Sequence, residues 1–186
     1  MRRFKISRIP AHAALTGLLF SAIATGEPSN FRVGVGLFQA DMQNAPAYLP
    51  DGSQNGISLF GEFPQSAHAA SRFMLYRING EDGVKLSGGE TQLMWGFNLN
   101  DEGFRAYTGP AWHYENIRVP ASSGGTRFRT FNGWGWQLGV GAQFRAVTLD
   151  LAATLRDPQD YNDENARAGQ PDGDVWTYSL LTSYRF

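Results

Sequence analysis

The sequence predicts an all-β protein: an eight-stranded antiparallel up-and-down transmembrane β-barrel, preceded by a cleavable signal peptide. Three observations support this prediction. The N-terminus is basic and then apolar, eight later stretches alternate apolar with polar residues, and the connections between those stretches alternate between long and short. A chain of 186 residues has room for one such domain.

Composition excludes several classes of protein. The chain has no cysteine, so disulfide frameworks, thiolate zinc sites and cysteine nucleophiles are all excluded. Its formal net charge is −1, which gives no reason to expect a nucleic-acid partner. No run of apolar residues is long enough for a transmembrane helix. The sequence predicts neither a cofactor nor a metal site.

Residues 1–26 have the pattern of a secretory signal peptide. Four basic residues precede an apolar run, and Ala22-Ile23-Ala24 fits a cleavage site, with Gly26 as the alternative end. An amphipathic helix packed on the domain is the other interpretation. Because four of the 16 basic residues and none of the 17 acidic ones lie in this segment, residues 27–186 carry a net charge of −5.

Alternation with period two is typical of strands that have two different faces. The clearest case is the last twelve residues, where Trp176, Tyr178 and Leu180 fall on one face. In the third range, Met74, Tyr76 and Ile78 compete with Phe73 and Leu75 for the apolar face. The eight predicted strands are 31–40, 57–63, 71–78, 91–99, 104–115, 132–144, 147–156 and 175–186.

The lengths of the connections predict the topology. Short connections separate strands two and three, four and five, and six and seven, whereas the other four intervals are long: 41–56, 79–90, 116–131 and 157–174. Tight turns at one end and long loops at the other are typical of transmembrane barrels. We therefore expect both termini in the periplasm and four long loops outside the cell.

The composition of the two strand faces predicts whether water or lipid surrounds the barrel. One face is apolar and the other is rich in Gly, Gln and Thr, and burying the second face in a soluble core would cost free energy without apolar gain. The apolar face therefore points to lipid. Aromatic residues on that face predict girdles at the membrane interfaces; they are Trp95, Trp112, Trp134, Trp136, Trp176, Tyr178 and Tyr184.

The last strand has aromatic or apolar residues at Tyr178, Leu180 and Tyr184, and it ends on Phe186. In this the chain resembles the small eight-stranded outer-membrane barrels of Gram-negative bacteria, of the OmpX, Ail and OmpA-membrane-domain type. The resemblance implies a location in the outer membrane and contact with outer-membrane lipids and lipopolysaccharide. It also implies that Phe186 belongs to an assembly signal read by the barrel assembly machinery.

The charges on the inward face predict an ion-pair network that plugs the lumen, because buried charges must be paired. Asp150 is expected to reach Arg185 on the adjacent strand. The predicted network consists of Arg32, Glu62, Arg105, Asp150, Arg156 and Arg185.

His113 and Glu115, two residues apart on one predicted strand, are the only candidates for catalysis. The segment is similar in outline to the His-x-Ser pair of PagL-type lipid A deacylases, which are also eight-stranded barrels. Glu115 occupies the serine position, so the nucleophile would have to come from a loop residue such as Ser122 or Ser123.

Two of the predicted loops carry clustered charge. The fourth has six carboxylates, for which calcium binding and simple solvation are the alternatives. In the third, Arg118, Arg127 and Arg129 could bind lipopolysaccharide phosphates or pair with the acidic fourth loop; we favour the pairing.

Eight strands enclose an interior that side chains can just fill, so a channel is not expected. The sequence therefore predicts a non-enzymatic protein of the cell surface, acting in surface structure or in interaction with an unknown ligand. A second possibility is an accessory role in polysaccharide export, because residues 103–112 are similar to strands of the BcsS-type barrels of cellulose biosynthesis. A lipid A-modifying barrel enzyme is the third.

Overall fold

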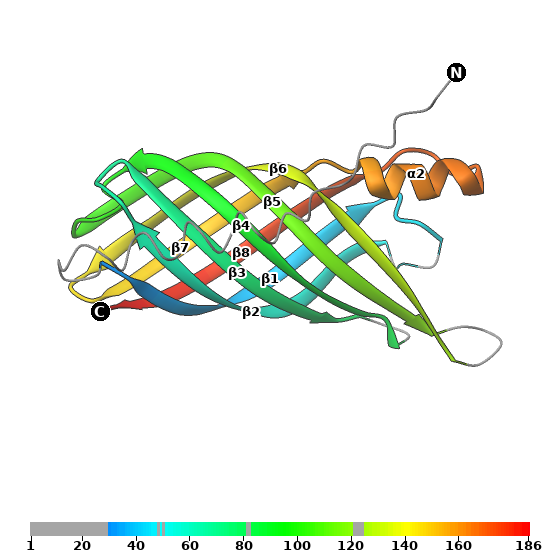
Figure 1. Ribbon diagram of the computed structural model, residues 1–186, viewed down its shortest axis with the longest axis horizontal. Helices are drawn as coiled ribbons and strands as arrows, with labels where there is room; N and C mark the ends of the chain where they lie inside the picture. Colours follow the sequence, from blue (N-terminus) through cyan, green and yellow to red (C-terminus); the bar gives the residue numbers. More distant parts are fainter. Residues whose placement is uncertain (1–29, 48, 50, 81–82, 121–124) are drawn as a thin grey trace, which may run out of the picture.

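A computed structural model describes residues 30–186 except 48, 50, 81–82 and 121–124. Eight strands pair antiparallel with their neighbours in chain order, and β1 pairs with β8 to close a barrel (Figure 1). The strands are β1 (Arg32–Gln43), β2 (Gly52–Pro64), β3 (Ala69–Asn79), β4 (Lys85–Phe97), β5 (Gly103–Pro120), β6 (Thr126–Phe144), β7 (Val147–Arg156) and β8 (Asp174–Arg185). The predicted signal peptide, residues 1–26, lies outside the described residues.

The predicted up-and-down barrel is confirmed, but several strands extend further than predicted. β5 and β6 continue beyond the rest of the barrel at the end opposite the short turns, which we call the loop end (Figure 1). Strand residues therefore make up half or more of each predicted long connection, 41–56, 79–90 and 116–131. The prediction was wrong here because a wall that rises above the lipid meets water, and apolar alternation is no longer needed on its outer face.

The fourth long connection differs from the prediction in another way, since it contains the helix α2 (Gln159–Ala168). Gly169 ends this helix in the left-handed region, at φ 68°, where its amide hydrogen-bonds the last turn. The Asn165 side chain donates to the carbonyl oxygens of Asn44 and Pro171, at 2.7 and 3.1 Å. These bonds hold α2 against the loop end of β1.

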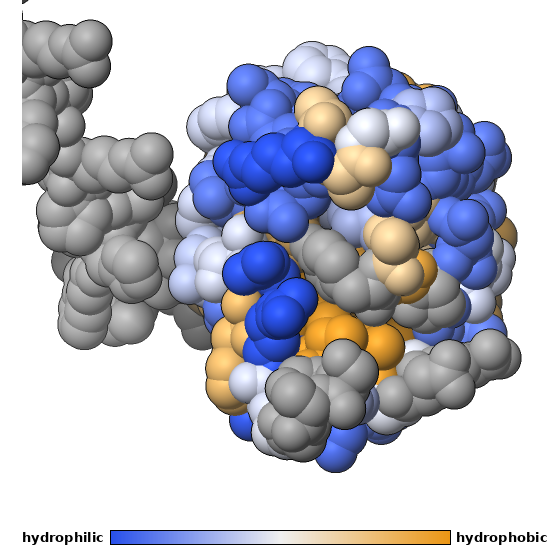
Figure 2. Space-filling view, turned by 90° about the vertical axis from the view of Figure 1, so that its right-hand side faces the viewer, coloured by the Kyte–Doolittle hydropathy of each residue, from blue (hydrophilic) through white to orange (hydrophobic). Residues whose placement is uncertain are grey.

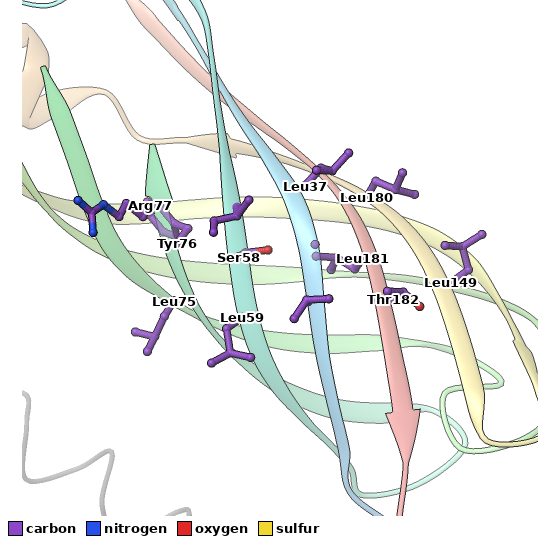
Figure 3. Close-up of a pocket in the computed structure, with 13 residues that line it drawn as sticks. Leu37, Ser58, Leu59, Leu75, Tyr76, Arg77, Leu149, Leu180, Leu181 and Thr182 are labelled. Carbon is purple, nitrogen blue, oxygen red and sulfur yellow. The ribbon is translucent and has the colours of Figure 1, made fainter. Parts of the chain in front are cut away.

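The two faces of the strands lie as predicted. Trp136 and Leu151 are 54% and 57% exposed on the outer wall, whereas Gln137 and Thr154 are 0% and 3% exposed inside. Leucines of β1, β2, β7 and β8 extend outward from the wall (Figure 3). An apolar belt around a polar interior is the arrangement that a lipid bilayer requires.

Aromatic side chains border the apolar belt. Near the short turns, which define the turn end, the outer wall carries Trp95, Phe97, Phe104, Phe144 and Tyr184. Toward the loop end, Trp112 and Trp134 are directly paired across β5 and β6, and the others are Trp136, Trp176 and Tyr178. Of the seven predicted girdle residues six are exposed and Trp112 is half-buried, and all seven are on the outer face.

The lumen is polar only in part. In β3, Met74, Tyr76 and Ile78 point inward and Leu75 points outward, which resolves the ambiguity of that strand. The prediction of a polar interior was wrong near the loop end, where apolar side chains form a core. Figure 2 shows an apolar area within a largely polar end surface. This loop-end core contains Met42, Leu49, Ile78, Val84, Leu86, Ile117, Phe131, Tyr161 and Val175.

No helix in the described part of the chain is both long and apolar enough to cross a membrane.

Position 139 requires glycine, because a side chain of the neighbouring strand lies too close to leave room for a Cβ atom. Tyr107 of β5 lies across Gly139 of the adjacent β6, and a Cβ atom there would come within 2.1 Å of the Tyr107 ring. An inward glycine thus makes room for a large neighbour in a narrow barrel.

We expect Gly139→Ala to lower the free energy of unfolding by about 1–3 kcal/mol, the usual cost of overpacking. Urea unfolding in lipid vesicles would measure it. Gly89→Ala is the matched control, because its Cβ would make ordinary contacts of 3.4 Å or more. Equal midpoints for the two variants would contradict the packing argument.

Candidate functional site

Charged side chains from five strands meet in the lumen near the turn end. Glu62 lies at the centre: Arg32 donates to its carboxylate, Arg72 Nη2 is 2.6 Å from Oε2, and Arg105 Nη2 is 2.9 Å from the same group. Asp150 accepts from Arg72 at 2.9 Å and lies 3.1 Å from Arg105 Nε. All five side chains are at most 2% exposed. We call this group the turn-end cluster.

The strand register brings this cluster together. Glu62 is directly opposite Arg32 on one side and Arg72 on the other. Aromatic rings complete the surroundings: the Arg72 guanidinium lies 5.2 Å from the rings of Phe60 and Tyr107 and donates to the Tyr107 hydroxyl at 3.0 Å. The cluster has one more guanidinium than carboxylate, and the ring faces partly balance that charge.

A second group, the loop-side cluster, lies further along the lumen. Arg156 Nη2 is 2.7 Å from Glu90, and Nη1 is 3.0 Å from Glu115. The Tyr76 hydroxyl donates to Glu115 at 2.8 Å and accepts from Arg156 at 3.1 Å. Gln92 donates to Glu90 at 2.7 Å. This cluster has one more carboxylate than guanidinium.

The two clusters together contain four arginines and four carboxylates, so the lumen is electrically balanced only as a whole. Above them the loop-end core closes the barrel. The lumen is therefore filled by ion pairs at one end and apolar packing at the other.

Of the predicted network, Arg32, Glu62, Arg105 and Asp150 lie in one cluster and Arg156 in the other. The expected pair of Asp150 with Arg185 is wrong. The register places Asp150 opposite Leu181, and Arg185 lies at the barrel rim, where it donates to the Asn100 carbonyl at 2.8 Å.

The predicted network omitted Arg72, Glu90 and Tyr76. Arg72 and Tyr76 lie on the strand whose apolar face was ambiguous. Glu90 preceded the predicted start of the fourth strand at residue 91, whereas β4 begins at Lys85. Extending the alternation of Gln92 and Met94 backward by one step would have placed Glu90 inside.

The catalytic candidates His113 and Glu115 point into the lumen, and His113 is 1% exposed. The Glu115 carboxylate is engaged by Arg156 and Tyr76. An acyl chain in the membrane would meet the opposite face of β5. Ser122 and Ser123 lie outside the described residues.

The acidic residues of the fourth connection are spread along α2 and its flanks. Within the described residues, no group of three or more His, Cys, Asp or Glu side chains converges on a point where a metal could bind. Glu164 pairs with Arg167 at 2.7 Å and lies 3.7 Å from Arg129 of β6. Asp160 accepts hydrogen bonds from the backbone and side chain of Asn132.

No family model matches this sequence, and no curated protein matches it. Solved structures do match. Ail of Yersinia pestis is 13% identical with a TM-score of 0.59, over 85% of this chain and 99% of Ail. Neisserial surface protein A is 15% identical with a TM-score of 0.60, over 84% and 97%. The N-terminal barrel domain of Pseudomonas aeruginosa OprF is 12% identical with a TM-score of 0.54, over 83% and 97%.

The chain has the fold of a small outer-membrane barrel. The closed eight-stranded topology, the apolar belt and the aromatic borders agree with that fold. One of the matching Ail structures is a complex with the heparin analogue sucrose octasulfate, at 13% identity and a TM-score of 0.55.

In this barrel, Glu62→Gln would leave three buried guanidiniums with one carboxylate. We expect it to lower the free energy of unfolding by about 3–5 kcal/mol, the usual result of breaking a buried ion pair. Urea unfolding in lipid vesicles would measure the change. Glu102→Gln, on an exposed turn, is the matched control, and equal stability of the two variants would contradict a structural role for the cluster.

Proposed function

We propose that this chain is a non-enzymatic, non-conducting barrel of the bacterial outer membrane that acts in cell-surface structure or interaction through its loop end. The observation that carries the proposal is the filled lumen. Four arginine side chains with 0% exposure block the barrel, and the loop-end core covers them. With the interior closed, chemistry directed at other molecules is confined to the outer surface.

The surface of the loop end carries a projecting hairpin, a helix and charged side chains. The β5–β6 hairpin projects beyond the other strands, and α2 lies at the same end (Figure 1). Arg127 is exposed on the hairpin, while Asp163 is exposed on α2. Charges of both signs at one end suit a protein or glycan surface that is itself mixed in charge.

An enzymatic role has little support from the geometry. A general base must come within hydrogen-bond distance of the proton that it removes. His113 is buried among lumen side chains, and Glu115 is held in an ion pair. Neither group faces the lipid side of β5.

The topology can be tested with single cysteines, because the chain has none of its own. Asp163→Cys on α2 should react with a membrane-impermeant maleimide on intact cells. Asp101→Cys, exposed on the turn between β4 and β5, should react only after the outer membrane is permeabilised. The reverse pattern would contradict the proposed orientation.

We expect lipid A from cells that express the chain to have the same acyl chains as lipid A from cells without it. Mass spectrometry of extracted lipid A would show this. A loss of one acyl chain that is restored by His113→Ala would overturn the non-enzymatic proposal.

A further inference from the structure

A groove runs along the outer wall over β3, β4 and β5. Its volume is about 530 Å³. Phe73 and Leu75 of β3 form one side, and Trp112 and Tyr114 of β5 form the other. The groove is thus an apolar trough in the part of the wall that faces lipid, next to the aromatic border of the loop end.

The groove exists because β4 presents small side chains there. Its outward positions Ser87, Gly89 and Thr91 lie between the larger residues of both neighbours. By contrast, the outward positions Val147, Leu149 and Leu151 of β7 carry large apolar side chains. The volume of the groove leaves room for an extended acyl chain.

Basic side chains lie directly above the groove. Arg77, Lys85 and Arg118 line an adjoining hollow of about 260 Å³, which shares Ser87 and Asn116 with the groove. Arg77 extends outward from β3 in the same direction as Leu75 (Figure 3). The three cations lie on three adjacent strands at the loop end.

Two of these cations lie so close together that their charges repel. Lys85 and Arg118 are direct cross-strand partners, and like charges in that position repel. Among the described residues, no carboxylate lies within 4.0 Å of Arg77, Lys85 or Arg118. An anion shared between them would relieve the repulsion.

Arg118 is held in place for such a contact. Its guanidinium lies 5.0 Å from the centre of the Phe128 ring on β6. Arg118 is four residues beyond Tyr114 on β5, which is a rise of roughly 10 Å along the barrel axis because the strand is tilted. This places the cations at headgroup level when the aromatic border marks the edge of the hydrocarbon.

We propose that Arg77, Lys85 and Arg118, together with the groove below them, bind one molecule of lipid A, a phosphorylated and acylated glycolipid. A phosphate accepts hydrogen bonds from the three cations, with a bidentate contact from Arg118, and an acyl chain lies in the groove. This proposal rests on the proposed function, because the loop end faces the outer leaflet only in that orientation.

Lipid retention by the purified protein tests the site. The folded barrel in detergent is mixed with bisphosphorylated lipid A, with lipid A stripped of both phosphates, or with phosphatidylglycerol, and bound lipid is counted by native mass spectrometry. The variants are Lys85→Gln/Arg118→Gln, which removes two of the three positive charges, and Gly89→Leu, which fills the groove. Arg145→Gln, exposed at the turn end, is the matched control.

We expect one bisphosphorylated lipid A per barrel. Its affinity should fall at least about tenfold, equivalent to 1.4 kcal/mol, in the double variant and in Gly89→Leu, and stay unchanged in Arg145→Gln. The dephosphorylated lipid should bind as weakly to the native chain as the intact lipid binds to the double variant. Equal binding by all variants, or equal binding of phosphatidylglycerol, would overturn the proposal.

Two controls keep the outcomes separate. Heat-modifiable migration on a gel shows that each variant is folded, and Gly89→Leu places an apolar side chain in an apolar wall, so it should fold. Retention in detergent does not depend on orientation in the cell. If Asp163→Cys labelled only after permeabilisation while lipid A retention held, the proposed orientation would fail and the binding site would remain.

Discussion

The charges buried inside this narrow closed barrel must balance, and that requirement governs how the whole interior packs. A bilayer allows no open sheet edge, so the wall closes and its polar face turns inward. Eight strands leave no room for bulk water, and each charge in the lumen must therefore find a partner across it. Four arginines and four carboxylates meet this requirement in two clusters of opposite excess charge.

The same narrowness explains the distribution of inward glycines. Large inward groups such as Tyr107 and Asp150 lie opposite Gly139 and Gly141, where any side chain would collide with them. Arginine, aromatic and glycine positions are thus parts of one packing solution. A substitution at one of these positions displaces side chains on the neighbouring strand, because the interior is closely packed.

Where the barrel wall extends beyond the lipid, the polar and apolar faces of the strands are exchanged. The outer face becomes polar, the lumen becomes apolar, and the barrel end is built like a small soluble protein around the loop-end core. The helix α2 and the β5–β6 hairpin belong to this part. A rigid end of this kind can present charges at fixed positions, which a set of long mobile loops could not do.

Period-two alternation and a long-short sequence of connections are local properties of the chain, so they are enough to predict the barrel, its strand order and which face meets lipid. The sequence also predicted β7 at its observed bounds, and it placed Glu62 and Asp150 inside. These predictions required only the spacing of residues within one strand.

Which charges pair depends on contacts that exist only in the folded barrel. Arg72 and Glu90 were not predicted, because the alternation of apolar and polar residues is ambiguous or weak where both faces of a strand carry large or polar residues. The partner of Asp150 depends on register and on contacts across the lumen, between strands far apart in the sequence. The loop-end extensions of β5 and β6 were likewise decided by pairing between strands, since their own residues, in water on one side, carry little apolar pattern.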